Sequence, residues 1–412
     1  MSCHNPNILI GQKLQSHNFF RILPLYHKPI PIIIMRKSIL LTLSFFLLSI
    51  LATAQTRLVE KVSKKGKEIV IPYEKYILSN GLTLIIHEDK SDPIVHVDVT
   101  YHVGSAREEI GKSGFAHFFE HMMFQGSDNV ADEEHFKIVT ESGGTLNGTT
   151  NRDRTNYFET MPSNQLEVAL WLEADRMGFL LDAVTQQKFE IQRATVKNER
   201  GQNYDNRPYG LAGEVTSKNM YPYGHPYSWL TIGYVEDLDR VNVDDLKNFF
   251  LRWYGPNNAV LTVGGDVNAK EVVKLVEKYF GSIPRGPEVK NMPKMPAKLD
   301  KDRYVSYEDN YIQLPLLRLN YPAVERYHKD EAALDCLAEI LGQGKNSIFY
   351  KNFVKSRKAL QASANNSASE LSGEFGFTVV PFPGTGLADM EKIIRESLVE
   401  FEQRGVSDDD LL

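Results

Sequence analysis

Cysteine is nearly absent from this chain of 412 residues, which contains only Cys3 and Cys336. We expect the segment that carries Cys3 to be removed, and a single remaining cysteine cannot form an internal disulfide. Stability must therefore come from burial of apolar side chains, although an exported location would permit disulfides.

Hydrophobic residues make up 42% of the chain and charged residues 24%, a globular composition unlike that of a collagen, a coiled coil or a disordered tail. The length suffices for two domains, each with its own core.

The chain also lacks an excess of positive charge, since it has 47 lysine and arginine residues against 53 aspartate and glutamate residues. The formal net charge is -6, and the first 54 residues contribute five basic residues and no acidic one, so the remainder has a net charge of -11. Nucleic-acid binding needs clustered lysine and arginine side chains that neutralise phosphates. The acidic body of the chain therefore argues against a nucleic-acid partner.

Long hydrophobic runs are missing except for one near the start, over residues 38–51. This run of about 14 residues is shorter than the roughly 20 that a spanning helix needs. It follows the basic residues of 35–37 and precedes the sequence Ala-Thr-Ala at 52–54, so it has the three parts of a secretory signal peptide. We predict a signal peptide at 35–54 and an exported protein, periplasmic or secreted; the alternative is an uncleaved membrane anchor. Residues 1–34 are then expected to derive from an upstream start codon.

Strand and helix patterns alternate from about residue 73 onward, which predicts a mixed fold of α and β elements. We predict a first domain over residues 70–285. Residues 286–298 are rich in proline and lysine and lack periodicity, as in a linker. A second, related domain over 299–412 is expected to be truncated, because 407–412 has the sequence of a helix start. The main predicted helices are 113–124, 166–181, 188–204, 241–253, 330–341 and 387–404, and the main predicted strands are 76–78, 82–86, 95–103, 144–151, 155–161, 259–265, 312–321 and 375–380.

The segment 114–126, GFAHFFEHMMFQG, carries the residues with the clearest chemistry. His117, Glu120 and His121 are spaced i, i+3 and i+4, so on a helix they project from one face. Two imidazoles one turn apart can chelate a single zinc ion, which lowers the pKa of bound water, while the adjacent carboxylate can take a proton. Without a metal, a polar triad among phenylalanines would be costly to bury. The alternative is that these are ordinary surface residues of an amphipathic helix.

The motif H-x-x-E-H is that of the inverzincins, and the sequence around it resembles the insulinase and pitrilysin family, which includes the mitochondrial processing peptidases. That family has a third zinc ligand, a glutamate on a later helix. The matching residue here is Glu199, in TVKNER and 78 positions after His121. The resemblance runs from about residue 76 to the end and includes further local matches: Arg207-Pro208-Tyr209-Gly210, His225-Pro226-Tyr227, Ile232-Gly233, Trp253-Tyr254 and Pro256-Asn257-Asn258-Ala259.

The resemblance implies an α+β fold of repeated α/β domains, each a mostly antiparallel sheet packed with helices. It implies one zinc ion per chain, held by His117, His121 and Glu199, with Glu120 as the catalytic base of a zinc metalloendopeptidase. Its substrates would be peptides or unfolded segments. One residue departs from the family pattern. Many members have a supporting carboxylate seven residues before the third ligand, where this chain has Gln192, which puts metal affinity or rate in question.

A glycine-rich segment over residues 143–150 resembles the family strand beside the zinc helix, to which a peptide substrate adds as an extra strand. Gly148 would let the substrate backbone approach closely, and Asn147 would hold one of its peptide groups. The alternative is a plain glycine turn leading into a hairpin. Elsewhere, His225 and the loop at 342–347 are interpreted as structural rather than as metal or phosphate sites.

The family also implies a partner. Its active members enclose a chamber between two halves, and the second half supplies an arginine and a tyrosine that assist catalysis. We expect that half as a C-terminal extension or as a separate homologous subunit. An alternative function is therefore a non-catalytic or weakly active subunit of a two-part peptidase. Another is a metal-dependent amidase that uses the same site.

Overall fold

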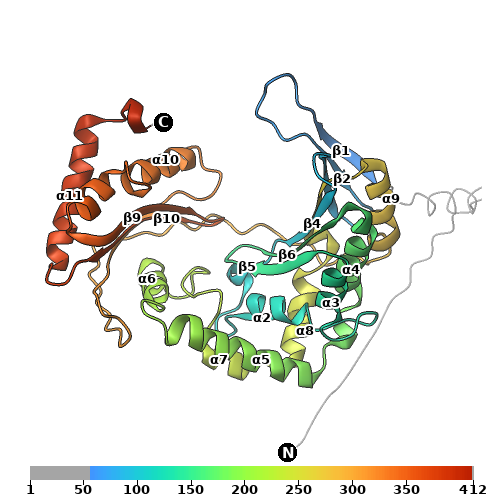
Figure 1. Cartoon of the computed structure of the whole chain (residues 1–412). Helices are drawn as coiled ribbons and strands as arrows, with labels where there is room; N and C mark the ends of the chain where they lie inside the picture. Colours follow the sequence, from blue (N-terminus) through green and yellow to red (C-terminus); the bar gives the residue numbers. More distant parts are fainter. Residues whose placement is uncertain (1–55, 411–412) are drawn as a thin grey trace, which may run out of the picture. The chain divides into compact units, whose positions relative to one another are not determined.

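The computed structural model describes residues 56–410 (Figure 1). The predicted signal peptide at 35–54 and the segment 1–34 lie outside these residues and stay predictions. Within the described range, every helix is too short or too polar to cross a bilayer.

A seven-stranded sheet forms the centre of the first part of the chain. Its strands are β1 (Arg57–Val62), β2 (Tyr73–Ile77), β3 (Thr83–Glu88), β4 (Ile94–Tyr101), β5 (Thr145–Thr150), β6 (Thr155–Pro162) and β7 (Ala259–Gly265). The spatial order is β1-β2-β3-β7-β4-β6-β5, and all neighbours are antiparallel except β3 and β7. Alternate residues of β4 and β6 are buried, as expected for strands with one face on a core. β5 is an edge strand whose neighbour in the sheet is β6.

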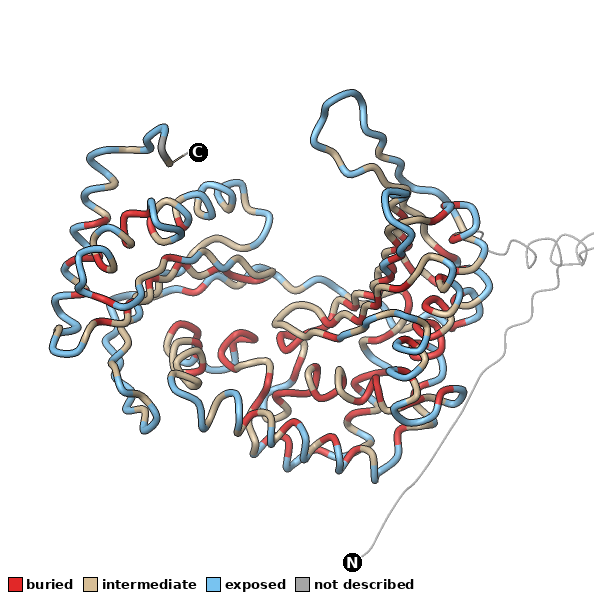
Figure 2. The backbone as a smooth tube through the Cα atoms, viewed as in Figure 1, coloured by how far each residue is buried: buried red, intermediate tan, exposed pale blue. Residues whose placement is uncertain are grey.

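Helices pack against this sheet and close one continuous core (Figure 2). They are α2 (Phe115–Met122), α3 (Glu134–Glu141), α4 (Leu166–Phe179), α5 (Gln186–Arg200), α7 (Val235–Arg240), α8 (Val243–Trp253) and α9 (Ala269–Phe280). A further helix, α6 (Ala212–Met220), lies outside this core, and its Met220 packs in a separate small apolar cluster with Tyr221 and Tyr227. α9 shows why such helices form. Asn268 caps its first turn by accepting from two backbone N–H groups. Its buried residues, including Val272 and Val276, recur at helical spacing and face the core.

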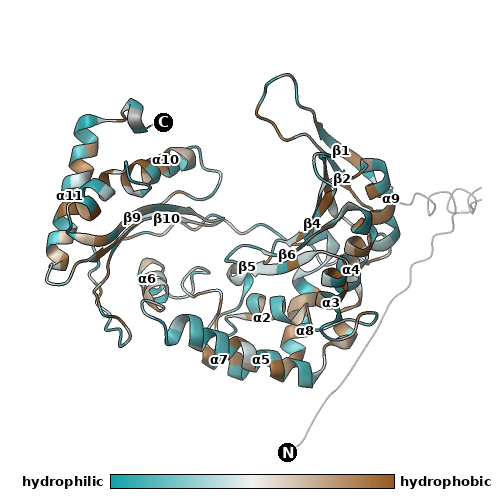
Figure 3. Ribbon diagram, viewed as in Figure 1, coloured by the Kyte–Doolittle hydropathy of each residue, from teal (hydrophilic) through white to brown (hydrophobic). Residues whose placement is uncertain are grey.

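A second, three-stranded sheet lies further along the chain. It comprises β8 (Leu317–Ala323), β9 (Ala359–Ala368) and β10 (Gly373–Pro381) in the order β8-β10-β9, all antiparallel. α10 (Glu331–Gly342) and α11 (Leu387–Arg404) cover it and share a separate apolar core. Hydrophilic residues follow much of α11, which is exposed along one side (Figure 3). No regular helix or strand occurs in the described chain between Phe280 and Leu317.

Most predicted elements are confirmed, with differences at their ends. The predicted helix at 188–204 begins earlier and ends as α5 at Arg200, followed by a π-helical turn over Gly201–Asp205. The predicted strand at 312–321 starts only at Leu317. Pro315 precedes this start, and a proline cannot donate a ladder hydrogen bond. The strands β1 and β9 and the helices α3, α6, α7 and α9 were not predicted.

Candidate metal centre

The helix α2 presents its two histidines opposite its apolar face. Its other face, which includes Phe118 and Phe119, is completely buried. The side chains of His117 and His121 remain 14% and 24% exposed, so both reach solvent. The expected helical geometry is therefore present, with the polar residues of the motif on the accessible side of a helix anchored in the core.

α5 brings the third predicted ligand to this face. Thr185 caps the helix by accepting from the Lys188 backbone N–H at 3.3 Å. Phe189 and Val196 are buried, and the Phe189 ring lies 5.0 Å from that of Phe118 on α2. Glu199 stands one turn after Val196 and so projects on the side that packs against α2. The π-helical turn that follows is a feature often found at functional sites.

The three side chains meet at distances that suit a metal ion. Glu199 Oε2 lies 3.6 Å from His117 Nε2 and 3.3 Å from His121 Nε2. The ligand atoms of all three residues lie within 4.8 Å of one another. Two atoms that each lie about 2.1 Å from a tetrahedral zinc ion are about 3.4 Å apart. The arrangement therefore fits a tetrahedral ion with a fourth position left for water or substrate.

The electrostatics give His117 and Glu199 the protonation states that metal ligands need. Burial lowers the pKa of His117 to about 4, assisted by His121 and opposed by Glu199, so its imidazole is neutral at pH 7. The hydrogen bond from His121 lowers the pKa of Glu199 and outweighs burial, which would raise it. Glu199 is therefore a carboxylate. A neutral imidazole and a carboxylate are ordinary zinc ligands.

Glu120 lies beside this group but is held by a different contact. Its Oε2 accepts a hydrogen bond of 2.5 Å from the Thr150 hydroxyl on β5. Burial raises the pKa of Glu120, which makes the carboxylate a stronger base. Sequence reasoning missed Thr150, although its position two residues after Gly148 places both on the same face of β5.

Gly148 is needed for the close approach of β5 to α2. A Cβ atom added there would lie 3.1 Å from Glu120 Cγ and 3.2 Å from Glu120 Oε1, tighter than ordinary van der Waals contact. Asn147 is exposed, and its Oδ1 accepts from the Gly148 N–H at 2.9 Å. Because side chains alternate along a strand, Asn147 projects to the face opposite Glu120. The substrate-binding roles of both residues stay predictions.

Gln192 is buried on α5, two turns before Glu199. Glu190 does not replace the missing carboxylate, because it is directed to Arg193 at 3.0 Å and to Gln186 at 2.7 Å. His225 has both ring nitrogens engaged, with Met295 O at 2.9 Å and with the Tyr227 N–H at 3.0 Å, which agrees with its predicted structural role.

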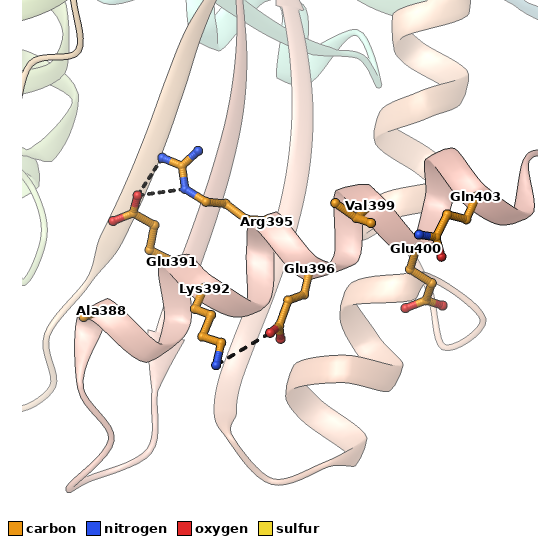
Figure 4. Close-up of a pocket in the computed structure, with 8 residues that line it drawn as sticks. All are labelled: Ala388, Glu391, Lys392, Arg395, Glu396, Val399, Glu400 and Gln403. Atoms are coloured by element: carbon orange, nitrogen blue, oxygen red, sulfur yellow. Dashed lines mark hydrogen bonds and ion pairs between the residues drawn. The ribbon is translucent and has the colours of Figure 1, made fainter.

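A surface hollow on α11 offers no comparable chemistry (Figure 4). Its charged side chains pair along the helix, Glu391 with Arg395 at 2.7 Å and Lys392 with Glu396 at 3.8 Å. Such exposed i,i+4 pairs are solvated and contribute little. The hollow is lined by one helix alone, at Ala388, Glu391, Lys392, Arg395, Glu396, Val399, Glu400 and Gln403.

Comparison with known proteins identifies the family. The model of insulinase (peptidase family M16) matches residues 83–221, and that of the peptidase M16 inactive domain matches residues 240–412. Zinc protease PqqE of Helicobacter pylori is 34% identical over 328 residues, which are 78% of this chain and 73% of that protein. The chain therefore belongs to peptidase family M16, and its predicted family is confirmed.

Solved structures agree with this assignment. A protease from Helicobacter pylori superposes with a TM-score of 0.79 at 32% identity, covering 83% of each chain. The periplasmic protease PqqL from Escherichia coli gives a TM-score of 0.69 at 19% identity, covering 85% of this chain and 39% of that one. The predicted mixed fold of mostly antiparallel sheets packed with helices is thereby confirmed. The names of the relatives support a zinc-dependent protease.

Proposed function

We propose that this chain is an exported zinc-dependent endopeptidase with one zinc ion held by His117, His121 and Glu199. The observation that carries the proposal is the meeting of the His117 and His121 imidazoles on α2 with the Glu199 carboxylate on α5, at 3.6 and 3.3 Å. Zinc, when bound, would polarise the scissile carbonyl and lower the pKa of a water molecule toward 7.

Glu120 supplies the proton transfers. Its partly buried carboxylate takes a proton from the attacking water and delivers it to the departing amine nitrogen. The Thr150 hydroxyl donates to Oε2 at 2.5 Å and so restrains the rotamer of that carboxylate. Gly148 keeps β5 close enough for this contact.

The substrate class follows from the edge position of β5. An extended peptide can add to this strand through backbone hydrogen bonds, and such pairing does not depend on side-chain identity. Peptides and unfolded segments can adopt the required extended form. Asn147, exposed on the same strand, would hold a peptide group of the substrate. Pairing along a strand favours cleavage within a peptide.

A second half is part of the proposal. The Escherichia coli structure is more than twice as long as the region that this chain matches, which supports a two-part organisation. A donor from the opposite half would stabilise the oxyanion, and one such donor is worth about 10²–10³ in rate. The second half would be joined in the same polypeptide or supplied by a homologous subunit. If it is absent, the chain would act as a weakly active subunit.

Export is supported by the predicted signal peptide at 35–54 and by the likeness to PqqL, a periplasmic protease of Escherichia coli. The whole proposal is tested by metal analysis of the purified chain together with hydrolysis of a quenched peptide mixture. We expect about one zinc per chain, and peptide cleavage that a chelator abolishes and zinc restores. A folded, metal-free protein that cleaves peptides equally well would overturn the proposal.

A further inference from the structure

The start of the metal-site helix is held by a buried carboxylate that lies outside the H-x-x-E-H motif. α2 begins after Gly114, whose φ of +89° is left-handed and whose lack of a side chain means that it cannot cap the helix. Glu108 replaces the missing cap. Its Oε2 accepts from the Gly114 N–H and its Oε1 from the Ala116 N–H, both at 2.9 Å.

A third donor completes the environment of Glu108. The Trp229 indole Nε1–H donates to Oε2 at 3.0 Å, and both residues are buried. In the part of the chain that the structure describes, Glu108 forms no ion pair with lysine, arginine or histidine. Burial raises its pKa to about 8, whereas the three N–H donors lower it. Both oxygens accept from N–H groups, so an acid proton would lack an acceptor. The carboxylate form is what fits this geometry, and the positive end of the helix dipole favours it.

Backbone packing makes this anchor rigid. A Cβ atom added to Gly114 would lie 2.7 Å from Ile232 O, and one added to Gly233 would lie 2.5 Å from Gly114 Cα. The residue before the helix is fixed as well, because Asp237 Oδ2 accepts from the Ser113 N–H at 3.1 Å and from its hydroxyl at 2.6 Å. The first turn of α2 is thus restrained on several sides before His117 is reached.

We propose that Glu108 is a positioning residue of the metal centre, acting through the first turn of α2 to set His117 and His121. This inference rests on the proposed function, since it presumes that these histidines bind zinc. Ala116, whose N–H Glu108 binds, immediately precedes His117. Metal–ligand distances are satisfied only within about 0.2 Å, so a small tilt of this short helix misplaces both imidazoles relative to Glu199.

The test compares Glu108→Gln with Glu109→Gln in the full chain. In the wild type, both carboxylate oxygens of Glu108 accept from backbone N–H groups. The amide that Glu108→Gln introduces replaces one oxygen by an NH₂ group, which would then face a backbone N–H. Glu109 is the neighbouring residue, but its side chain is 82% exposed and its pairing with Lys112 is loose at 3.8 Å. Zinc affinity is measured by competition with a chromophoric chelator, and ligand geometry by the visible absorption of the cobalt-substituted protein.

We expect Glu108→Gln to weaken zinc binding about 10–100-fold, the range found for groups that support metal ligands, and to alter the cobalt spectrum. Glu109→Gln should match the wild type in both. Trp229→Phe keeps the Glu108 carboxylate and removes one of its three N–H donors, so it should weaken zinc binding severalfold. If Glu108→Gln does not fold, the zinc affinity of Trp229→Phe tests the proposed role of Glu108 instead. Unchanged affinity and spectrum in whichever of these variants folds would overturn the inference alone. Failure of the wild type to bind zinc or cobalt would overturn the metal centre itself, and the inference with it.

Discussion

Two groups of histidine and glutamate side chains bring their ligand atoms within 4.8 Å of one another, and they differ in what surrounds them. The first is His117 and His121 with Glu199, which are partly exposed. The second is His135 with Glu159 and Glu173, which are all buried. By residue type and by the distance between ligand atoms alone, both groups qualify as metal sites.

An arginine distinguishes the second group. Arg176 pairs with Glu173 one turn away on α4, and its guanidinium lies 4.5 Å from the centre of the Tyr157 ring. Burial raises the pKa of Glu159, and the neighbouring Glu173 adds to that rise, which favours the neutral acid form of Glu159. The charge of the Glu173 carboxylate is thus balanced by the Arg176 guanidinium, and Glu159 as a neutral acid adds no charge. A divalent ion would bring uncompensated charge into a buried site.

The first group has no such competitor, because within residues 56–410 Glu199 pairs with the two histidines and with no lysine or arginine. It also reaches solvent, so that an ion and a substrate can enter. The comparison teaches that proximity of ligand atoms does not define a metal site. Access and the absence of a resident cation decide between a metal centre and a buried ion pair.

The largest difference between the groups should appear on removing one histidine from each. His121→Ala should lose stoichiometric zinc and all peptide hydrolysis, because the remaining two ligands cannot hold the ion. His135→Ala should keep about one zinc per folded chain. Metal analysis after dialysis against a weak chelator provides the measurement. Retention of zinc by His121→Ala, or its loss from folded His135→Ala, would reverse the assignment of the two groups.

Within the first group, ligand and base can be separated. Glu120→Gln should retain zinc but lower kcat by about 10²–10⁴, since the attacking water loses its base. Parallel zinc titrations and steady-state kinetics on one quenched peptide suffice. A variant that lost zinc as readily as His121→Ala would show that Glu120 is a ligand.

Changes in the second group should lower the free energy of unfolding instead of affecting zinc binding. Glu173→Gln leaves Arg176 buried without a charged partner, which typically costs about 3–5 kcal/mol of the free energy of unfolding. Glu190→Gln is the matched control, because the Glu190–Arg193 pair is more exposed and such pairs contribute about 0–1 kcal/mol. Denaturant unfolding of the metal-free proteins makes the comparison. Equal free energies of unfolding for Glu173→Gln and Glu190→Gln would show that the Glu173–Arg176 ion pair does not stabilise the second group.

Sequence patterns predicted the features that depend only on residues close together in the chain. The spacing of His117 and His121 places them on one helix face whatever the tertiary structure, and period-two alternation predicted β4. Glu199 could be assigned only through the family resemblance, because its approach to α2 depends on how two helices pack. β9 escaped prediction because its sequence, ALQASANNSA, consists largely of small and polar residues.

The groups that support the site were missed for the same physical reason. The bonds from Glu108 to the start of α2 and from Thr150 to Glu120 connect different elements, and neither residue belongs to a motif of fixed spacing. A cap is recognisable from sequence when it directly precedes its helix, as Asn268 does for α9. Glu108 is separated from α2 by a loop, and only the folded chain brings it there.

The smallest effect should come from Thr150, which contacts the proposed base Glu120 and has no proposed part in proton transfer. Thr150→Val removes the hydroxyl that donates to Glu120 Oε2 and keeps the branched shape, whereas Thr150→Ser keeps the hydroxyl. A hydrogen bond to a charged group is worth about 1.5–3 kcal/mol, but the carboxylate keeps its place beside Gly148. We therefore expect Thr150→Val to lower kcat roughly tenfold, with KM and zinc content unchanged, and Thr150→Ser to restore most of the rate. Steady-state kinetics on the two variants separates positioning of the base from substrate binding on β5. A change in KM alone would place Thr150 in the substrate strand's pairing rather than in the support of Glu120.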